Sequence, residues 1–210
     1  IPILSFLVQQ GRCRTCGSKI SWQYPIIEVG GGIIGSLIYF KFPTSNFQSL
    51  ASFVVYFGAF AVLFLVAAYD FKHKIVDRHF LYVFGGFAAA SAIFRNFEIS
   101  KFRYEDVLSA VFIFLFFYSL WRFSGGRWMG RGDADFAFFL ALFLGYPLGL
   151  FMLLGSFWIG ALAGIVLLFV RSQTITLKSE IPFGPFLAGS GFLAWFFGDI
   201  LILVYGLLFS

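Results

Sequence analysis

Long apolar runs separated by short polar breaks dominate this sequence. A helix needs about 17–25 mostly apolar residues to cross a bilayer, and the runs predict about seven such spans. Their expected limits are Ile26–Phe42, Leu50–Tyr69, Phe80–Phe94, Val107–Phe123, Phe136–Met152, Gly155–Val170 and Phe186–Leu208, the last being long enough to be tilted or broken. Stretches such as Val111–Ser119 are apolar on every side, so they lack the alternation of a membrane β-barrel. The predicted fold is therefore all-α, a polytopic transmembrane helix bundle.

The composition supports a membrane protein and excludes an ordinary soluble domain. Of the 210 residues, 60% are hydrophobic and 12% are charged, and the mean hydropathy is +0.90. We expect residues 26–210 to form the bundle and residues 1–25 to form a cytoplasmic loop. The sequence starts with Ile1 and not with Met, so we also expect further sequence upstream of it.

The basic residues indicate the orientation of the bundle. Most of the 15 Lys and Arg residues, such as Arg12, Arg78 and Arg131, fall in segments on one side, whereas Arg95 and Arg103 fall on the other. By the positive-inside rule the first side faces the cytoplasm. The net charge of +5 is spread over several loops and forms no single stripe, so it does not predict nucleic-acid binding.

Two acidic residues at the ends of apolar runs are candidates for catalysis. Asp70 ends the run Phe60–Tyr69, and Asp133 closes the motif Gly130-Arg131-Gly132-Asp133 just before another run. An acid at membrane depth costs at least about 2.5–3.5 kcal/mol, so its presence calls for a reason. Both fall on the predicted cytoplasmic face, where one carboxyl could hold a proton while the other activates water, as in aspartic proteases. The alternative is that each Asp is solvated or caps a helix.

Four separate blocks of the sequence resemble the type IV prepilin leader peptidases, which are related to presenilin-like proteases. The blocks are Ile1–Glu28, Asp70–Val76, the GxGD motif ending in Asp133, and the IPFGPFLA segment Ile181–Ala188. The resemblance implies that Asp70 and Asp133 are catalytic, and that proteolysis needs no cofactor. It implies supporting roles for the motif residues Gly130, Gly132, Pro182, Gly184 and Pro185. The chain departs from the family pattern at Asp77, Arg78 and Asp135.

The resemblance also implies a substrate and a location. Members of this family are aspartic endopeptidases of the inner (cytoplasmic) membrane that act in type IV pilus assembly and protein secretion. They remove a short basic leader from prepilins or pseudopilins, cutting after Gly where a hydrophobic helix begins. The expected partners are thus such a precursor and the lipid bilayer, with the active site facing the cytoplasm.

Two further features of the first 42 residues are open to more than one interpretation. Cys13 and Cys16 form one CxxC pair, which is half of a structural zinc site or simply two reduced thiols. Many members of the family also methylate the new N-terminus with S-adenosylmethionine. Glu28 and Gly32 match positions of the region associated with that methyltransferase activity.

Two other functions remain possible from the residues alone. Acids and glycine-rich breaks within membranes also occur in ion- or proton-coupled transporters. The clustering of the acids at one face, away from the middle of any span, argues against a transporter. Asp77 and Asp135 are the only sequence support for an inactive pilus-assembly scaffold.

Overall fold

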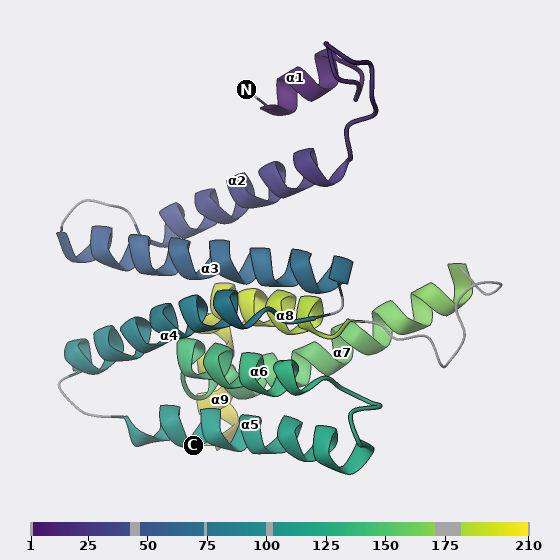
Figure 1. Ribbon diagram of the computed structural model, residues 1–210. Coiled ribbons are helices and arrows are strands. Elements are labelled where there is room, and N and C mark those ends of the chain that lie inside the picture. Colours follow the sequence, from purple (N-terminus) through teal and green to yellow (C-terminus); the bar gives the residue numbers. More distant parts are fainter. Residues whose placement is uncertain (1, 43–46, 74, 100–102, 171–181, 210) are drawn as a thin grey trace. The chain divides into compact units, whose positions relative to one another are not determined.

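The computed structural model describes residues 2–42, 47–73, 75–99, 103–170 and 182–209 (Figure 1). Within these residues the chain forms nine helices and no strand, so the predicted all-α fold is confirmed. The helices are α1 Pro2–Val8, α2 Gln23–Lys41, α3 Phe47–His73, α4 Arg78–Ile99, α5 Tyr104–Ser124, α6 Arg131–Leu144, α7 Leu148–Val170, α8 Gly184–Phe196 and α9 Gly198–Phe209. Ile1, Lys74 and Ile181, which belong to the motifs quoted above, lie outside the described residues.

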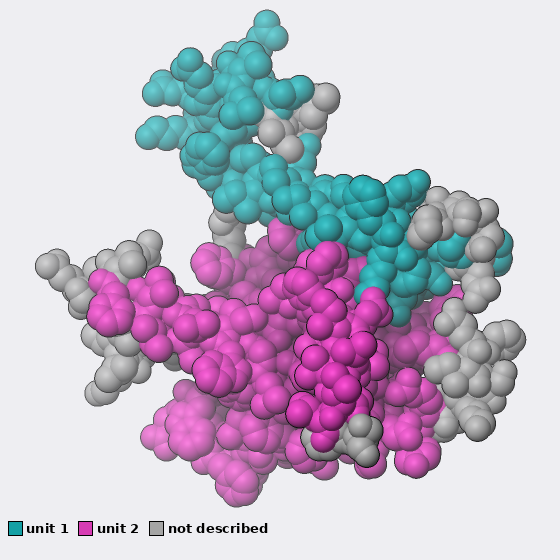
Figure 2. All heavy atoms as spheres, turned by 180° about the vertical axis from the view of Figure 1, so that it is seen from behind, with its two compact units in different colours: residues 1–61 teal, residues 62–210 magenta. Residues whose placement is uncertain are grey.

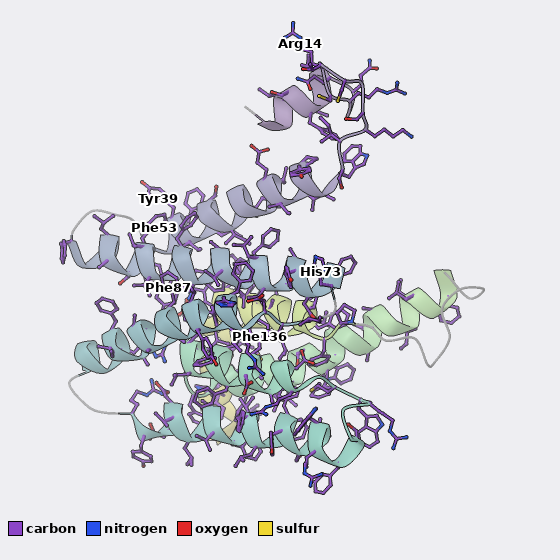
Figure 3. The ribbon with its side chains drawn as sticks, in the orientation of Figure 1. Arg14, Tyr39, Phe53, His73, Phe87 and Phe136 are labelled. Carbon is purple, nitrogen blue, oxygen red and sulfur yellow. The ribbon has the colours of Figure 1, made fainter. Side chains whose placement is uncertain are left out.

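The chain divides into two compact units within helix α3. Residues 1–61 form the first unit and residues 62–210 the second, as the two colours of Figure 2 show. In the first unit α1 packs on α2, with the rings of Phe6 and Trp22 4.9 Å apart. The rings of Tyr39 on α2 and Phe53 on α3 lie 6.3 Å apart (Figure 3). The predicted boundary after residue 25 stays a prediction.

Helix α6 is at the centre of the second unit. It packs against α4, α5, α7 and α8, and it lies between α4 and α5 in the view of Figure 1. Phe136, Leu140 and Phe143 on α6 are completely buried. Phe84 of α4 lies against two of these rings, at 6.0 Å from Phe136 and 5.7 Å from Phe143. Asp133 therefore starts the most enclosed helix of its unit.

Several helices are suited to a membrane, which makes this a multi-pass membrane protein. Among the described residues, three segments are long and apolar enough to cross a bilayer: Ser49–Phe71, Tyr104–Ser124 and Leu148–Leu167. Helices α8 and α9 together make a fourth if a pair bent by 78° is counted as one span. The last apolar run, expected to be tilted, broken or preceded by a re-entrant piece, is thus bent between α8 and α9, but the predicted number of about seven spans is not confirmed.

The predicted span Phe136–Met152 is wrong, because two helices meet inside it. Helix α6 ends at Leu144 and α7 begins at Leu148. Gly145 has a φ of 74°, a conformation that glycine adopts readily, and Pro147 lacks the N–H that a continuing helix needs. With 14 residues at about 1.5 Å each, α6 is about 21 Å long and cannot cross the hydrocarbon core alone.

Candidate active site

Asp70 lies in the last turn of α3 and is only 4% exposed. Its Oδ2 accepts a hydrogen bond from the backbone N–H of Gly184, at 3.0 Å. A carboxylate near a helix C-terminus is unfavourable because the helix dipole is negative there. Gly184 is the first residue of α8, so the positive N-terminal end of a second helix compensates for that position.

Gly184 is held so close to Asp70 that no side chain fits. A Cβ added at Gly184 would lie 2.5 Å from Asp70 Oδ2 and 3.1 Å from its Cγ. Pro185 follows at the start of α8, and Pro182 is half-buried just before it. The glycine of the IPFGPFLA segment therefore allows the backbone of α8 to reach the Asp70 carboxylate.

We expect Gly184→Ala to lower the cleavage rate at least about tenfold, because the added methyl must push the Asp70 carboxylate aside. Gly189→Ala is a matched control on the same helix, since a Cβ there meets nothing within 4 Å. Initial rates of leader cleavage in detergent would measure both. Equal rates for the two variants would contradict this role for Gly184.

Asp133 is the third residue of α6 and is 7% exposed. Its Oδ2 accepts the backbone N–H of Gly130 at 3.1 Å, and its own N–H donates to the Gly130 carbonyl at 3.2 Å. A Cβ on Gly132 would lie 3.0 Å from that of Val76, so the GxGD turn packs against the loop that follows Asp70. The two motifs of the sequence thus meet in one place.

The two carboxyl groups influence each other electrostatically. Asp133 precedes the apolar part of α6, and burial, together with the negative charge of Asp70, raises the pKa of Asp133 to about 7. The Gly130 N–H opposes this change in part. A pair in which one carboxyl keeps its proton near neutral pH beside an acidic partner is what acid–base catalysis by two carboxyls requires.

Comparison with known proteins agrees with this geometry. A family model described as the Type IV leader peptidase family matches residues 57–165, which include both Asp70 and Asp133. A second, described as the Bacterial Peptidase A24 N-terminal domain, matches residues 1–42. The chain belongs to the type IV leader peptidase family. The resemblance seen in the sequence is confirmed, and the protein is a peptidase.

Curated relatives of this leader peptidase carry the name prepilin leader peptidase/N-methyltransferase. The protein from Bacillus subtilis is 31% identical over 98% of this chain and 78% of its own length. The protein from Pseudomonas aeruginosa is 26% identical over 98% of this chain and 69% of its own length. The protein from Legionella pneumophila is 26% identical over 96% of this chain and 68% of its own length. No solved structure matches the chain.

The acidic departures from the family pattern have ordinary structural roles in this leader peptidase. Asp77 precedes α4 and caps it: its Oδ1 accepts the His79 N–H at 2.7 Å, and this bond lowers the pKa of Asp77. Asp135 lines a pocket of about 530 Å³ together with Arg131. The described lining of that pocket includes neither Asp70 nor Asp133. Neither extra acid joins the pair.

The remaining candidates lie in the first unit of the leader peptidase. Cys16 Sγ lies 3.1 Å from the Ser18 hydroxyl, and hydrogen bonding to Ser18 lowers the pKa of Cys16 to about 7. Two thiols supply half of the four ligands of a structural zinc site, and the described residues contain no group of three or more His, Cys, Asp or Glu able to hold a metal. Zinc at Cys13 and Cys16 stays a prediction. Glu28 and Gly32 lie one turn apart on α2.

Sequence reasoning missed the direct partner of Asp70 and the segment that packs against the GxGD turn. The sequence predicted only a supporting role for Gly184, yet its backbone N–H donates to Asp70, which lies 114 positions earlier in the sequence. Val76 lies against Gly132 in the same way. The glycines were the visible signal, since close backbone approach is a common reason for glycine, but their partners are set by tertiary packing.

Proposed function

We propose that this peptidase removes the leader from type IV prepilin-like precursors, with Asp70 and Asp133 as its catalytic pair. The observation that carries the proposal is the pairing of two buried carboxyl groups, from the end of α3 and the start of α6, in one electrostatic unit. The printed names of the relatives supply the substrate class. Incubating the purified protein with a precursor and reading the new N-terminus by mass spectrometry tests it. A precursor left intact would defeat it.

The surroundings of each carboxyl favour a division of roles. Asp70 accepts the Gly184 N–H at the N-terminal end of α8, and the raised pKa of Asp133 favours its protonated form near neutral pH, so we assign the role of base to Asp70 and that of acid to Asp133. Asp70 takes a proton from water, and the water oxygen attacks the carbonyl carbon of the scissile peptide. Asp133 donates its proton to the carbonyl oxygen. Asp70 then passes the proton it took from water to the amide nitrogen as the C–N bond breaks. Asp133 recovers a proton from a hydroxyl of the tetrahedral intermediate, and the products are a new carboxyl group and a free amine.

The position of Asp70 favours cleavage at the membrane boundary. Asp70 lies one residue before the end of the membrane-compatible segment Ser49–Phe71. The distribution of basic residues assigns this end to the cytoplasm. A precursor whose hydrophobic helix rests in the inner membrane and whose basic leader stays in the cytoplasm would present its Gly-Phe bond at that depth, where water is available for hydrolysis.

A second activity, methylation of the new N-terminus, belongs to the proposal because residues 1–42 match the N-terminal family model and the relatives are named N-methyltransferases. S-adenosylmethionine would supply the methyl group. Glu28 is half-buried, and Gly32, one turn later on α2, has open space beside its backbone. These two residues would belong to the cofactor site that the family resemblance implies.

We expect Glu28→Gln to lower methylation at least about tenfold while leaving cleavage within about twofold, since the carboxylate would be lost only from the methyl-transfer site. Gly31→Ala serves as the control. Gly31 lies on the same helix, and a Cβ there, as at Gly32, meets nothing within 4 Å. Mass spectrometry of the product separates the two activities by the 14 Da of a methyl group, about the mass of one CH₂ unit. Unchanged methylation in Glu28→Gln would contradict the assignment.

A further inference from the structure

The short helix α6 needs an anchor that the bilayer does not give it. At about 21 Å it is shorter than the hydrocarbon core of about 30 Å, so membrane thickness does not fix its position along its own axis. Its first turn carries Asp133. Gly130 precedes this turn and Gly132 lies within it, and glycine restrains the backbone little. The contacts at the other end of α6 therefore add to its side-chain packing in setting where Asp133 lies along that axis.

Two carbonyl groups at the C-terminal end of α6 lack the partners a continuing helix would give them. The N–H four residues after Phe143 would come from Pro147, which has none. The N–H four residues after Leu142 belongs to Tyr146, and it donates instead to Asp106 Oδ1 at 2.8 Å. Buried carbonyl groups in this situation need another donor.

Arg95 of α4 is that donor. Its Nη2 donates to the Leu142 carbonyl at 2.7 Å, and its Nη1 donates to the Phe143 carbonyl and to the Ser91 hydroxyl. Ser91 in turn donates to the Phe143 carbonyl at 3.2 Å. A guanidinium at a helix C-terminus also interacts favourably with the helix dipole. Helix α4 thus holds the end of α6 through the two planar branches of one side chain.

Asp106 of α5 completes the arrangement. It is 1% exposed, and its Oδ2 lies 3.4 Å from Arg95 Nε. Arg103 lies 3.8 Å from Asp106 Oδ1 and donates to the Tyr146 carbonyl at 2.9 Å. The turn after α6 is therefore fixed from α4 by Arg95 and from α5 by Asp106.

We propose that Arg95 and Asp106 are positioning residues of the peptidase, which hold α6 along its axis and so set Asp133 against Asp70. This inference rests on the proposed catalytic role of Asp133. A buried ion pair is weak evidence of stabilisation, because the cost of desolvation offsets the attraction between the charges. Charged side chains within membrane proteins are rare and usually have a function. A displacement of about 1 Å between catalytic groups, by contrast, can cost about 100-fold in rate.

The test compares Arg95→Gln, Asp106→Asn and the double variant in detergent. The probe is a synthetic precursor with a Lys-rich leader, a Gly-Phe junction and a hydrophobic helix. Each single variant should lower kcat about 10- to 100-fold and change KM less than about twofold. The double variant leaves no unpaired buried charge, so its thermal unfolding temperature should recover while its kcat stays low.

The control is Ser156→Ala, because Ser156 is buried in α7 and donates to the Leu153 carbonyl within its own helix. It should lower the unfolding temperature slightly and leave kcat unchanged. If Arg95→Gln fails to fold, Arg95→Lys retains the charge but cannot reach both carbonyl groups, and it should fold with a reduced kcat.

Two outcomes would overturn the positioning role: a normal kcat in the folded single variants, or a kcat that recovers together with stability in the double variant. Asp133→Asn in the same assay separates this failure from that of the proposed function. Normal cleavage by Asp133→Asn would defeat the catalytic assignment itself. An inactive Asp133→Asn beside a fully active Arg95→Gln would defeat only the positioning role.

Discussion

Asp70→Asn and Asp133→Asn should each reduce leader cleavage at least about 1,000-fold. An amide can neither take a proton from water nor deliver one to the carbonyl oxygen, so either change removes one half of the acid–base pair. The double variant should be no worse than either single variant, because the two groups act as a unit. Cleavage of a synthetic precursor, followed by mass spectrometry over several hours, covers the required range of rates.

Asp135→Asn is the matched control for this experiment. Asp135 lies two positions from Asp133 on the same helix, but it lines a pocket with Arg131 whose described lining includes neither Asp70 nor Asp133. It should keep its activity within about threefold of the wild type. Loss of cleavage in Asp135→Asn with normal cleavage in Asp133→Asn would show that the second catalytic residue had been misplaced.

The proximity of Asp70 and Asp133, the proposed catalytic pair, was predictable because its signals are local. An Asp that ends an apolar run is expensive at membrane depth, and the glycines before Asp133 mark a turn with close backbone contacts. Counting spans placed both residues on one face even though one predicted span was wrong. That error fell after Asp133, between Gly145 and Pro147, so it did not change the side on which Asp133 was placed.

The supports of the pair were not predictable from one sequence. In the sequence Arg95 counted only as a basic residue on the far side, and Asp106 was not singled out. That they meet at the end of α6 depends on the break at Pro147, where Arg95 donates to carbonyl groups that a continuing helix would bond to its own backbone. The contact between Gly184 and Asp70 likewise depends on how α8 packs against the end of α3.

The same packing gives the departures from the family pattern a simple explanation. Asp77 caps α4 through the His79 N–H, and such a role requires only an acceptor side chain before the helix. The inactive-scaffold alternative relied on Asp77 and Asp135, and neither lies in the catalytic pair. The transporter alternative needs acids within the membrane interior, whereas Asp70 lies at the end of its membrane-compatible segment.

Cleavage should fall as the pH rises above about 7, to about 50-fold less activity at pH 9 than at pH 7. The reason is the proton on Asp133. Burial and the charge of Asp70 raise the pKa of Asp133 to about 7, so Asp133 is protonated below that pH and ionised above it. In the ionised state both carboxyl groups are negative, and no acid remains to protonate the carbonyl oxygen.

On the acid side, activity should fall once the pair takes up a second proton, because no base then remains to activate water. The profile of kcat/KM should thus be bell-shaped, and its two limbs belong to the pair and not to one residue. Circular dichroism at each pH, and recovery of activity on return to pH 6.5, would show that the protein stays folded. Constant activity from pH 6 to pH 9 would contradict a shared-proton mechanism, since a carboxyl that must act as an acid cannot remain active when it has lost its proton.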